Sequence, residues 1–240
     1  MKSKASTKKI RIAIVGVSGR MGQEIYALAN ETKKFVVVSG VGTSEAELEP
    51  PHYVKKISDL DPKKVDVVID FSQPALMSDV TEWCSRNKIS LVSGTTGLSS
   101  AEEKALRAAS KNTAVLWAAN MSMGVTLVSE MLRILAKYEN AEFQIEELHH
   151  KRKKDSPSGT ALFLQKVLQG ERKEKLQAPL SIRGGGIFGI HRIWAMAEEE
   201  TITIEHTAMN RKVFARGALQ AAEWLVAQKP GLYRMANVFA

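Results

Sequence analysis

The sequence predicts an α/β protein with a Rossmann-like, doubly wound parallel sheet and a second α+β domain that carries a mixed or antiparallel sheet. Three observations support this prediction. An apolar, β-rich run at residues 10–15 leads directly into a glycine-rich turn, strands and helices then alternate as far as residue 120, and a long helix with several extended segments follows. Such alternation is typical of parallel βαβ units, and the later pattern favours a separate domain.

The first half of the chain alternates between the two kinds of element. The run IRIAIV at 10–15 is typical of a central parallel strand that is covered on both faces. Ser99 or Ser100 is expected to cap a helix, because Glu102 and Glu103 then fall in its first turn. The expected strands are 10–15, 35–39, 65–71, 89–92 and 114–118, and the other expected helices are 21–30 and 75–87.

After residue 120 the pattern changes to helices combined with mostly antiparallel strands. The expected elements are a long helix at 125–137, a strand at 143–149, a short helix at 161–168, an extended piece at 180–183, strands at 187–196 and 200–207, and a helix at 215–228. The last helix is expected to pack back on the first domain. We therefore expect one domain at 1–120 plus 212–240, and a second at 121–211.

Composition is that of an ordinary globular protein. The chain has 240 residues, of which 44% are hydrophobic and 25% charged. Cys84 is the only cysteine, so no intrachain disulfide or cysteine-rich metal site is expected, and a cytoplasmic location fits. No stretch approaches the ~20 apolar residues of a membrane span. Residues 1–8, which include three lysines, are expected to be a frayed tail rather than part of a signal peptide.

The net charge of +8 raises the alternative of a nucleic-acid-binding protein. Such a protein should interleave basic and aromatic residues or carry a recognisable reading motif. The basic run at 151–154 contains no aromatic residue, and only 6% of the chain is aromatic. We therefore expect no nucleic-acid partner and interpret the charge as a surface that steers small anions into a cleft.

The turn Gly16-Val-Ser-Gly19-Arg-Met-Gly22 has the spacing of a dinucleotide-binding turn. Gly16 lets the chain leave the strand sharply, Gly19 lets a pyrophosphate approach the backbone, and Gly22 lets the helix pack closely on the sheet. The phosphates would then lie at the positive end of the helix. An ordinary tight turn is the alternative, but the βαβ context favours a nicotinamide dinucleotide.

The carboxylate that usually binds the adenosine ribose of NAD is missing. It is expected after the second strand, about 20 residues past the turn. Here residues 39–44 contain no acid, and the first one is Glu45. Without that negative charge a 2′-phosphate is tolerated, so we expect either NADPH or NADH, with a slight preference for NADPH and with Arg20 and Thr43 as its phosphate partners.

Two later loops are expected to meet the cofactor. Residues 94–97 (GTTG) follow the strand at 89–92, and residues 118–121 (AANM) follow the strand at 114–118. Ligands of open α/β sheets bind beyond the carboxyl ends of the strands, where both loops should converge. Either loop taken singly could also be a plain connection.

The densest group of reactive side chains follows the strand at 143–149. His149 and His150 are adjacent, so they should point to opposite faces and need not act together. The basic run at 151–154 comes next, and the sequence Pro-Ser-Gly-Thr at 157–160 begins a helix whose amides and hydroxyls suit a carboxylate or phosphate. A solvated basic loop and a helix cap are the alternatives; together with the histidines, the segment predicts a site for an acidic substrate.

These motifs resemble those of the dihydrodipicolinate reductase family. The resemblance runs in order from the first strand almost to the last residue, and the segment at 147–160 is its most specific part. The matching strings are Gly16–Gly22, Asp70–Ser72, Gly94–Gly97, Ala119–Ser122, Glu147–Thr160, Arg183-x-Gly185-x-x-x-Gly189-x-His191, Glu205–Ala208 and Gly231–Tyr233.

The resemblance implies reduction of dihydrodipicolinate to tetrahydrodipicolinate, in diaminopimelate and lysine biosynthesis, by hydride from the nicotinamide C4. It implies an acid/base role for His149 and a proton-donor role for Lys153. The residues implied to bind substrate are His150, Ser158, Gly159 and Thr160. The residues implied to bind cofactor are Gly16, Val17, Ser18, Gly19, Arg20, Met21, Gly94, Thr95, Thr96, Ala118, Ala119, Asn120 and Met121.

The resemblance also implies a homotetramer assembled through the sheets of the second domain, closure of the two domains around a small cyclic dicarboxylate, and no metal. The chain departs from the family pattern in its missing ribose acid, in Met121 where an aromatic residue often lies, and in a short segment between Gly170 and Arg183. Two alternative functions are disfavoured by the same residues. A homoserine or aspartate dehydrogenase, the first alternative, should lack the segment at 147–160. A non-catalytic dinucleotide sensor would not need both His149 and Lys153.

Overall fold

The computed structural model describes residues 9–43 and 52–239. The expected frayed tail, 1–8, and Glu45 lie outside the described residues. The chain divides into two compact units, a first one of Met1–Met121 with Phe214–Ala240 and a second one of Ser122–Val213. The helix near the C-terminus therefore belongs mainly to the first unit.

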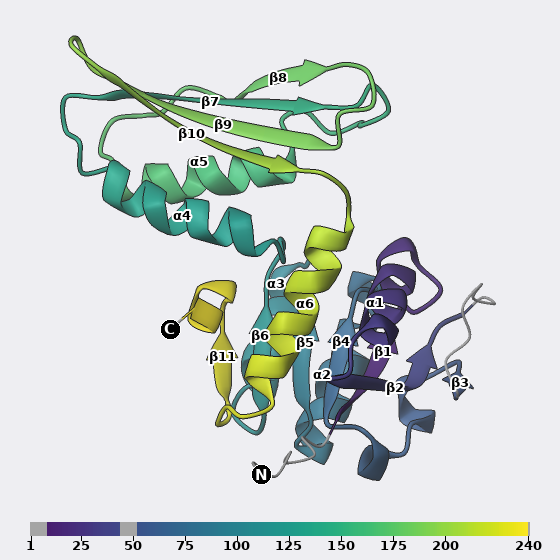
Figure 1. Ribbon diagram of the computed structural model, residues 1–240. Coiled ribbons are helices and arrows are strands. Elements are labelled where there is room, and N and C mark those ends of the chain that lie inside the picture. The colour runs from purple at the N-terminus through teal and green to yellow at the C-terminus, as the bar shows by residue number, and fades with distance from the viewer. Residues whose placement is uncertain (1–8, 44–51, 240) are drawn as a thin grey trace, which may run out of the picture. The chain divides into compact units, whose positions relative to one another are not determined.

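The first unit is built on a seven-stranded sheet in the order β11-β6-β5-β4-β1-β2-β3, and every neighbouring pair is parallel (Figure 1). The strands are β1 (Ile10–Val15), β2 (Phe35–Val41), β3 (Tyr53–Val54), β4 (Val67–Asp70), β5 (Ser90–Ser93), β6 (Ala114–Trp117) and β11 (Gly231–Tyr233). The strand order reverses between β1 and β4, which is the topological switch point where such sheets bind ligands.

Helices join these parallel strands. They are α1 (Arg20–Glu31), α2 (Met77–Asn87), α3 (Ser100–Ala109) and α6 (Lys212–Leu225), with short 3-10 turns η1 (Ile57–Asp59), η2 (Pro62–Lys64), η3 (Pro74–Leu76) and η4 (Met235–Phe239). Ser99 caps α3 and forms a reciprocal capping box with Glu102. All residues of β4 and the last four of β1 are buried, as expected for strands covered on both faces.

The second unit has a four-stranded mixed sheet in the order β10-β9-β7-β8. Its elements are α4 (Met123–Leu135), β7 (Glu142–His149), α5 (Gly159–Glu171), β8 (Leu180–Arg183), β9 (Gly189–Met196) and β10 (Thr201–Ala208). β7 runs parallel to β8 and antiparallel to β9. Both helices lie on one face of the sheet (Figure 1), and Leu132, Leu164 and Ile193 form part of the core between them.

The fold predicted from the sequence is confirmed, with differences at short elements. The helix expected at 161–168 extends over Gly159–Glu171 because Ser158 caps it. β3 and β11, of two and three residues, were not predicted, because such short strands carry no measurable periodicity. No helix in the described part of the chain is long and apolar enough to cross a bilayer.

Candidate functional site

The glycine turn of the first unit is a tight connection that requires its glycines. Gly16 adopts φ +80°, and a Cβ atom there would lie 2.6 Å from the carbonyl oxygen of Phe71. The amides of Gly16 and Val17 donate to the carbonyl of Val41, at 2.9 and 3.2 Å, and tie the turn to the end of β2. The backbone at the carboxyl ends of β1, β2 and β4 is therefore closely packed.

The start of α1 is open to a ligand. Gly19 is the N-cap and supplies no side-chain hydrogen bond, and Gly19 and Arg20 are exposed. A Cβ on Gly22 would lie 2.2 Å from the carbonyl oxygen of Gly16, so the helix sits against the turn. Gly19 places no side chain over the exposed helix start, so the residues present fit the pyrophosphate of a dinucleotide at the positive helix end.

The loops after β5 and β6 lie at neighbouring strand ends, as the sequence predicts. Thr95 is buried and its hydroxyl donates to Asp70 at 2.8 Å. The indole of Trp117 donates to the carbonyl of Thr95 at 2.9 Å and so joins the two loops. The exposed side chains in this region are those of Thr96 and Ala119.

Asp70, at the end of β4, holds this edge of the sheet together. Its two carboxylate oxygens accept hydrogen bonds from the hydroxyls of Ser72, Ser93 and Thr95, at 2.5, 2.8 and 2.8 Å. Met121, in contrast, is only 1% exposed, so its side chain packs inside the protein. Asp70 belongs to a motif of the sequence, but only the structure assigns it this role.

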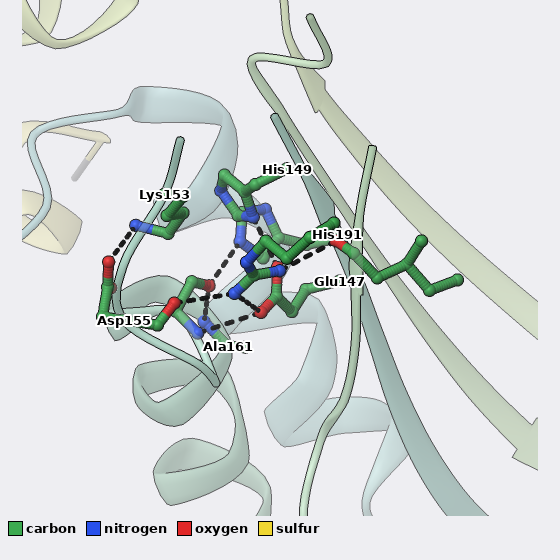
Figure 2. Close-up of polar contacts among 9 residues, drawn as sticks. Glu147, His149, Lys153, Asp155, Ala161 and His191 are labelled. Atoms are coloured by element: carbon green, nitrogen blue, oxygen red, sulfur yellow. Dashed lines mark hydrogen bonds and ion pairs between the residues drawn. The ribbon is translucent and has the colours of Figure 1, made fainter. Parts of the chain in front are cut away.

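The second unit contains a buried carboxylate beside the first histidine. His149 is the last residue of β7, and its Nδ1 hydrogen-bonds to the Glu147 carboxylate (Figure 2). Burial lowers the pKa of His149, and the contact with Glu147 only partly offsets this effect. His149 is therefore a neutral imidazole near neutral pH, able to exchange a proton.

Arg183 is the partner that makes the buried carboxylate stable. Its Nη1 and Nη2 donate to the two oxygens of Glu147 at 2.9 and 2.7 Å, and the amide of Ser158 donates to the same carboxylate at 3.1 Å. Burial raises the pKa of Glu147, but these bonds and the one to His149 outweigh it and lower the pKa to about 2. Glu147 is fully buried and ionised.

Lys153 lies in the loop that joins β7 to α5. Its ammonium is 2.9 Å from the carboxylate of Asp155 (Figure 2). Burial raises the pKa of Asp155, but hydrogen bonds from Lys153 and from the Gly159 backbone lower it below its ordinary value. The ammonium thus pairs with a carboxylate in the loop that leads into α5. Lys153 is also close enough to His149 for its charge to lower the pKa of that imidazole.

The predicted substrate-binding residues differ in accessibility. Ser158 is 1% exposed, and its hydroxyl accepts from the Ala161 amide at 3.2 Å and contacts His191 at 3.1 Å. Gly159 is exposed, and nothing lies within 4 Å of a Cβ built on it. His150 and Thr160 are half-buried.

Two further histidines lie on the helix-facing side of the sheet. His191 on β9 pairs directly with His206 on β10, and the rings of His191 and His149 are 5.3 Å apart. Burial, together with the neighbouring histidines, lowers the pKa of His191 to about 4. Among the described residues, no group of three or more His, Cys, Asp or Glu side chains is arranged to hold a metal ion.

The arrangement joins an exposed helix start, an imidazole held by a carboxylate and an ammonium. Sequence reasoning identified His149, Lys153 and the start of α5. It assigned no role to Glu147 or Arg183, although both stood in the matched motifs. Their pairing spans 36 residues of sequence and depends on the register of β7 with β8.

Family models match almost the whole chain. The model described as "Dihydrodipicolinate reductase, N-terminus" matches residues 10–121. The model described as "Dihydrodipicolinate reductase, C-terminus" matches residues 124–239.

Individual relatives agree with the family models. A 4-hydroxy-tetrahydrodipicolinate reductase of Bdellovibrio bacteriovorus is 46% identical over 231 residues, which cover 96% of this chain and 96% of the relative. One of Caldanaerobacter subterraneus is 37% identical over 249 residues, covering 95% and 98%. A dipicolinate-bound dihydrodipicolinate reductase from Paenisporosarcina sp. TG-14 has the same fold, with a TM-score of 0.81, 23% identity and coverage of 95% and 98%.

Proposed function

The chain belongs to the dihydrodipicolinate reductase family, and on this premise we propose that it reduces dihydrodipicolinate to tetrahydrodipicolinate. It is an NAD(P)-dependent oxidoreductase of the lysine and diaminopimelate pathway. In the proposed reaction NADH or NADPH is oxidised by loss of a hydride, the unsaturated ring gains that hydride, and a proton from the enzyme completes the reduction.

One observation carries the proposal for the substrate. The Lys153 ammonium contacts a carboxylate, that of Asp155, in the loop that leads into α5. A site that already holds a carboxylate has the charge and the donors that a cyclic dicarboxylate needs. The relative from Paenisporosarcina has dipicolinate bound, which is a ligand of this chemical class.

The proposed roles of the side chains follow from their chemistry. Hydride addition to a conjugated ring leaves negative charge, which a nearby cation stabilises and a proton donor quenches. Lys153 is suited to give that proton, and His149, with its lowered pKa, to act as the acid/base group. His150, Gly159 and Thr160 would bind the carboxylates. Ser158, whose hydroxyl is buried, would contribute by holding the start of α5.

The first unit is proposed to bind the cofactor and the second to bind substrate, with the division expected from the sequence at 1–120 plus 212–240 and 121–211. When bound, the nicotinamide supplies the hydride. The glycine turn would hold the pyrophosphate, and the loops at 94–96 and 118–121 would line the nicotinamide side. The described residues at the end of β2 and just after it, Ser39 to Thr43, include no acid. No carboxylate there would repel a 2′-phosphate, which supports acceptance of NADPH with Arg20 and Thr43 at that phosphate.

The outer face of the four-stranded sheet supports a homotetramer. Both helices of the second unit, all of whose residues are described, lie on the other face (Figure 1). The outer face presents Leu180 and Ile182, which are 58% and 45% exposed, beside the half-buried Leu148, Ile190 and Trp194. Apolar side chains grouped in this way favour burial against other copies. A cytoplasmic location completes the proposal, as expected for this biosynthetic step.

A steady-state assay tests the function. Enzymatically generated dihydrodipicolinate is supplied with NADH or NADPH in parallel, and nicotinamide oxidation is followed by absorbance. Oxidation with both cofactors, at a somewhat higher kcat/KM for NADPH, is expected. No substrate-dependent oxidation of either cofactor would contradict the proposal.

A further inference from the structure

Both terminal nitrogens of the Arg183 guanidinium donate hydrogen bonds within the second unit. Besides its two bonds to Glu147, its Nη2 donates to the carbonyl of Asp155 at 2.7 Å and its Nη1 to that of Ile182 at 2.8 Å. A planar guanidinium that holds both oxygens of one carboxylate fixes orientation as well as distance. Arg183 is also the residue that pairs with His149 in the register of β7 and β8.

The bond between Glu147 and His149 determines which nitrogen of the imidazole can exchange a proton. An ionised carboxylate only accepts hydrogen bonds, so Nδ1 of His149 must carry a hydrogen. Nε2 is then the nitrogen that gains and loses the proton. It borders Gly189, where a Cβ atom would lie 3.0 Å away, so no side chain from that position covers it.

Arg183 also contacts the loop that carries Lys153, the other proposed reactive group. The carbonyl that it holds belongs to Asp155, whose carboxylate pairs with the Lys153 ammonium. One guanidinium therefore contacts the carboxylate that orients His149 and the backbone of the residue that orients Lys153. These contacts join segments 36 and 28 residues apart in the chain.

We propose that Glu147 and Arg183 are a positioning pair for the reduction. Glu147 fixes His149 in the Nδ1–H tautomer, and Arg183 holds Glu147 and the Lys153 loop in one geometry. The inference rests on the roles proposed above for His149 and Lys153. Neither member of the pair needs to touch substrate.

The tautomer can be measured without turnover. In ¹⁵N-labelled wild-type protein, the Nδ1 resonance of His149 should be that of a protonated nitrogen and the Nε2 resonance that of an unprotonated one at pH 8. The opposite assignment, or a rapidly exchanging mixture, would overturn the proposal. This result decides the inference even if the wild-type chain failed to reduce dihydrodipicolinate, which would contradict only the proposed function.

Glu147→Gln removes the charge and keeps the shape. The charged and titratable groups that face His149 are Glu147 on β7, Arg183 on β8, His191 on β9 and Lys153 in the loop. Without the anion, the remaining cations lower the pKa of His149 further. In the pH profile of kcat/KM, the change that reflects ionisation of His149 should therefore move to lower pH. We expect kcat to fall about 10- to 100-fold and the KM for NADPH to change less than about 2-fold.

Arg183→Lys provides a second variant, and Arg11→Lys is its matched control. Arg11 contacts Asp66 through Nε and Nη2 at 3.1 and 2.6 Å, a similar pair in the first unit. Arg183→Lys should lower kcat at least about 10-fold, whereas Arg11→Lys should leave kcat and the pH profile unchanged. If Arg183→Lys, like Arg11→Lys, lowered only the melting temperature, or if Glu147→Gln left the pH profile in place, the pair would be purely structural and the proposal wrong.

Discussion

The glycine turn of the first unit and the charged cluster of the second unit, both proposed to bind anions, are built by different means. The turn works through backbone, because a side chain at Gly16 or Gly22 would collide with main-chain atoms. The cluster works through side chains, with a buried ion pair between Glu147 and Arg183 and a more exposed one between Lys153 and Asp155. On the proposed function, the first kind of site would recognise a phosphate in any dinucleotide, whereas the second would determine which substrate reacts.

The comparison predicts the largest effect for loss of a reacting group in the second unit. Lys153→Ala and His149→Ala should each lower kcat about 10²- to 10⁴-fold, because a positioned proton donor or acceptor is lost. Cofactor affinity, measured by fluorescence titration with NADPH, should change less than about 2-fold, since the turn is untouched. A parallel loss of cofactor affinity and activity would contradict the assigned roles.

The next effect is a pH dependence of the free energy of unfolding, which is expected from the histidines of the second unit and not from the glycine turn. The folded-state pKa of His191 is about 4, against an ordinary 6.5, so the unfolded chain binds more protons between these values. Stability is therefore lost as pH falls from 6.5 to 4, by about 3 kcal/mol for this residue. His149 and His206 contribute in the same direction.

Urea unfolding followed from pH 7 to pH 4 measures this loss. His191→Gln retains a polar atom near Ser158 and removes the titration, so its free energy of unfolding should fall less steeply over that range. Equal slopes for the variant and the wild type would show that His191 does not carry the effect. The glycine turn holds no group that titrates there, so affinity for NADH, which lacks the 2′-phosphate, should be flatter with pH than stability.

A smaller effect is expected from filling the turn. A Cβ on Gly22 would lie 2.2 Å from a backbone oxygen, so Gly22→Ala should force α1 away and cost about 1–3 kcal/mol. NADPH affinity should fall with it, as titration and thermal melting would show. Gly170→Ala is the matched control, because that position in α5 has nothing within 4 Å and should be neutral or stabilised by about 0.5–1 kcal/mol.

The smallest effect compares two serines with the same local structure. Ser158 and Ser122 each cap a helix and contact a histidine of the sheet, at 3.1 and 3.4 Å. Alanine at either position should cost about 1 kcal/mol in urea unfolding. Only Ser158→Ala should raise the KM for dihydrodipicolinate, because only α5 begins at the proposed carboxylate site. An equal rise for both variants would argue against that placement.

What the sequence could reveal differs between the two sites for a physical reason. The turn lies within seven residues, and its glycine spacing is set by local backbone geometry, so it could be interpreted directly. His149 and Lys153 could be selected as candidates because they stand in one short segment. The partner of Glu147 could not, because Arg183 reaches it only through the pairing of β7 with β8, and a pattern along the chain does not specify strand register.

The sequence also did not predict which of the proposed ligand-binding side chains are buried. Ser158 and Thr95 were expected to face ligands, yet both hydroxyls make internal hydrogen bonds. Met121 is likewise enclosed. A small polar residue in a ligand-facing loop serves equally well as a support for the loop, and only the packed structure distinguishes the two uses.

Transfer of an isotope tests the central claim most directly. The wild-type protein is given dihydrodipicolinate and NADPH carrying deuterium in the transferable position of C4, and the product is analysed by mass spectrometry. The account predicts one deuterium in each tetrahydrodipicolinate formed, and about 10²- to 10⁴-fold slower formation of that deuterated product by Lys153→Ala in the same mixture. Product without deuterium, or NADPH oxidation that does not depend on the dicarboxylate, would contradict it.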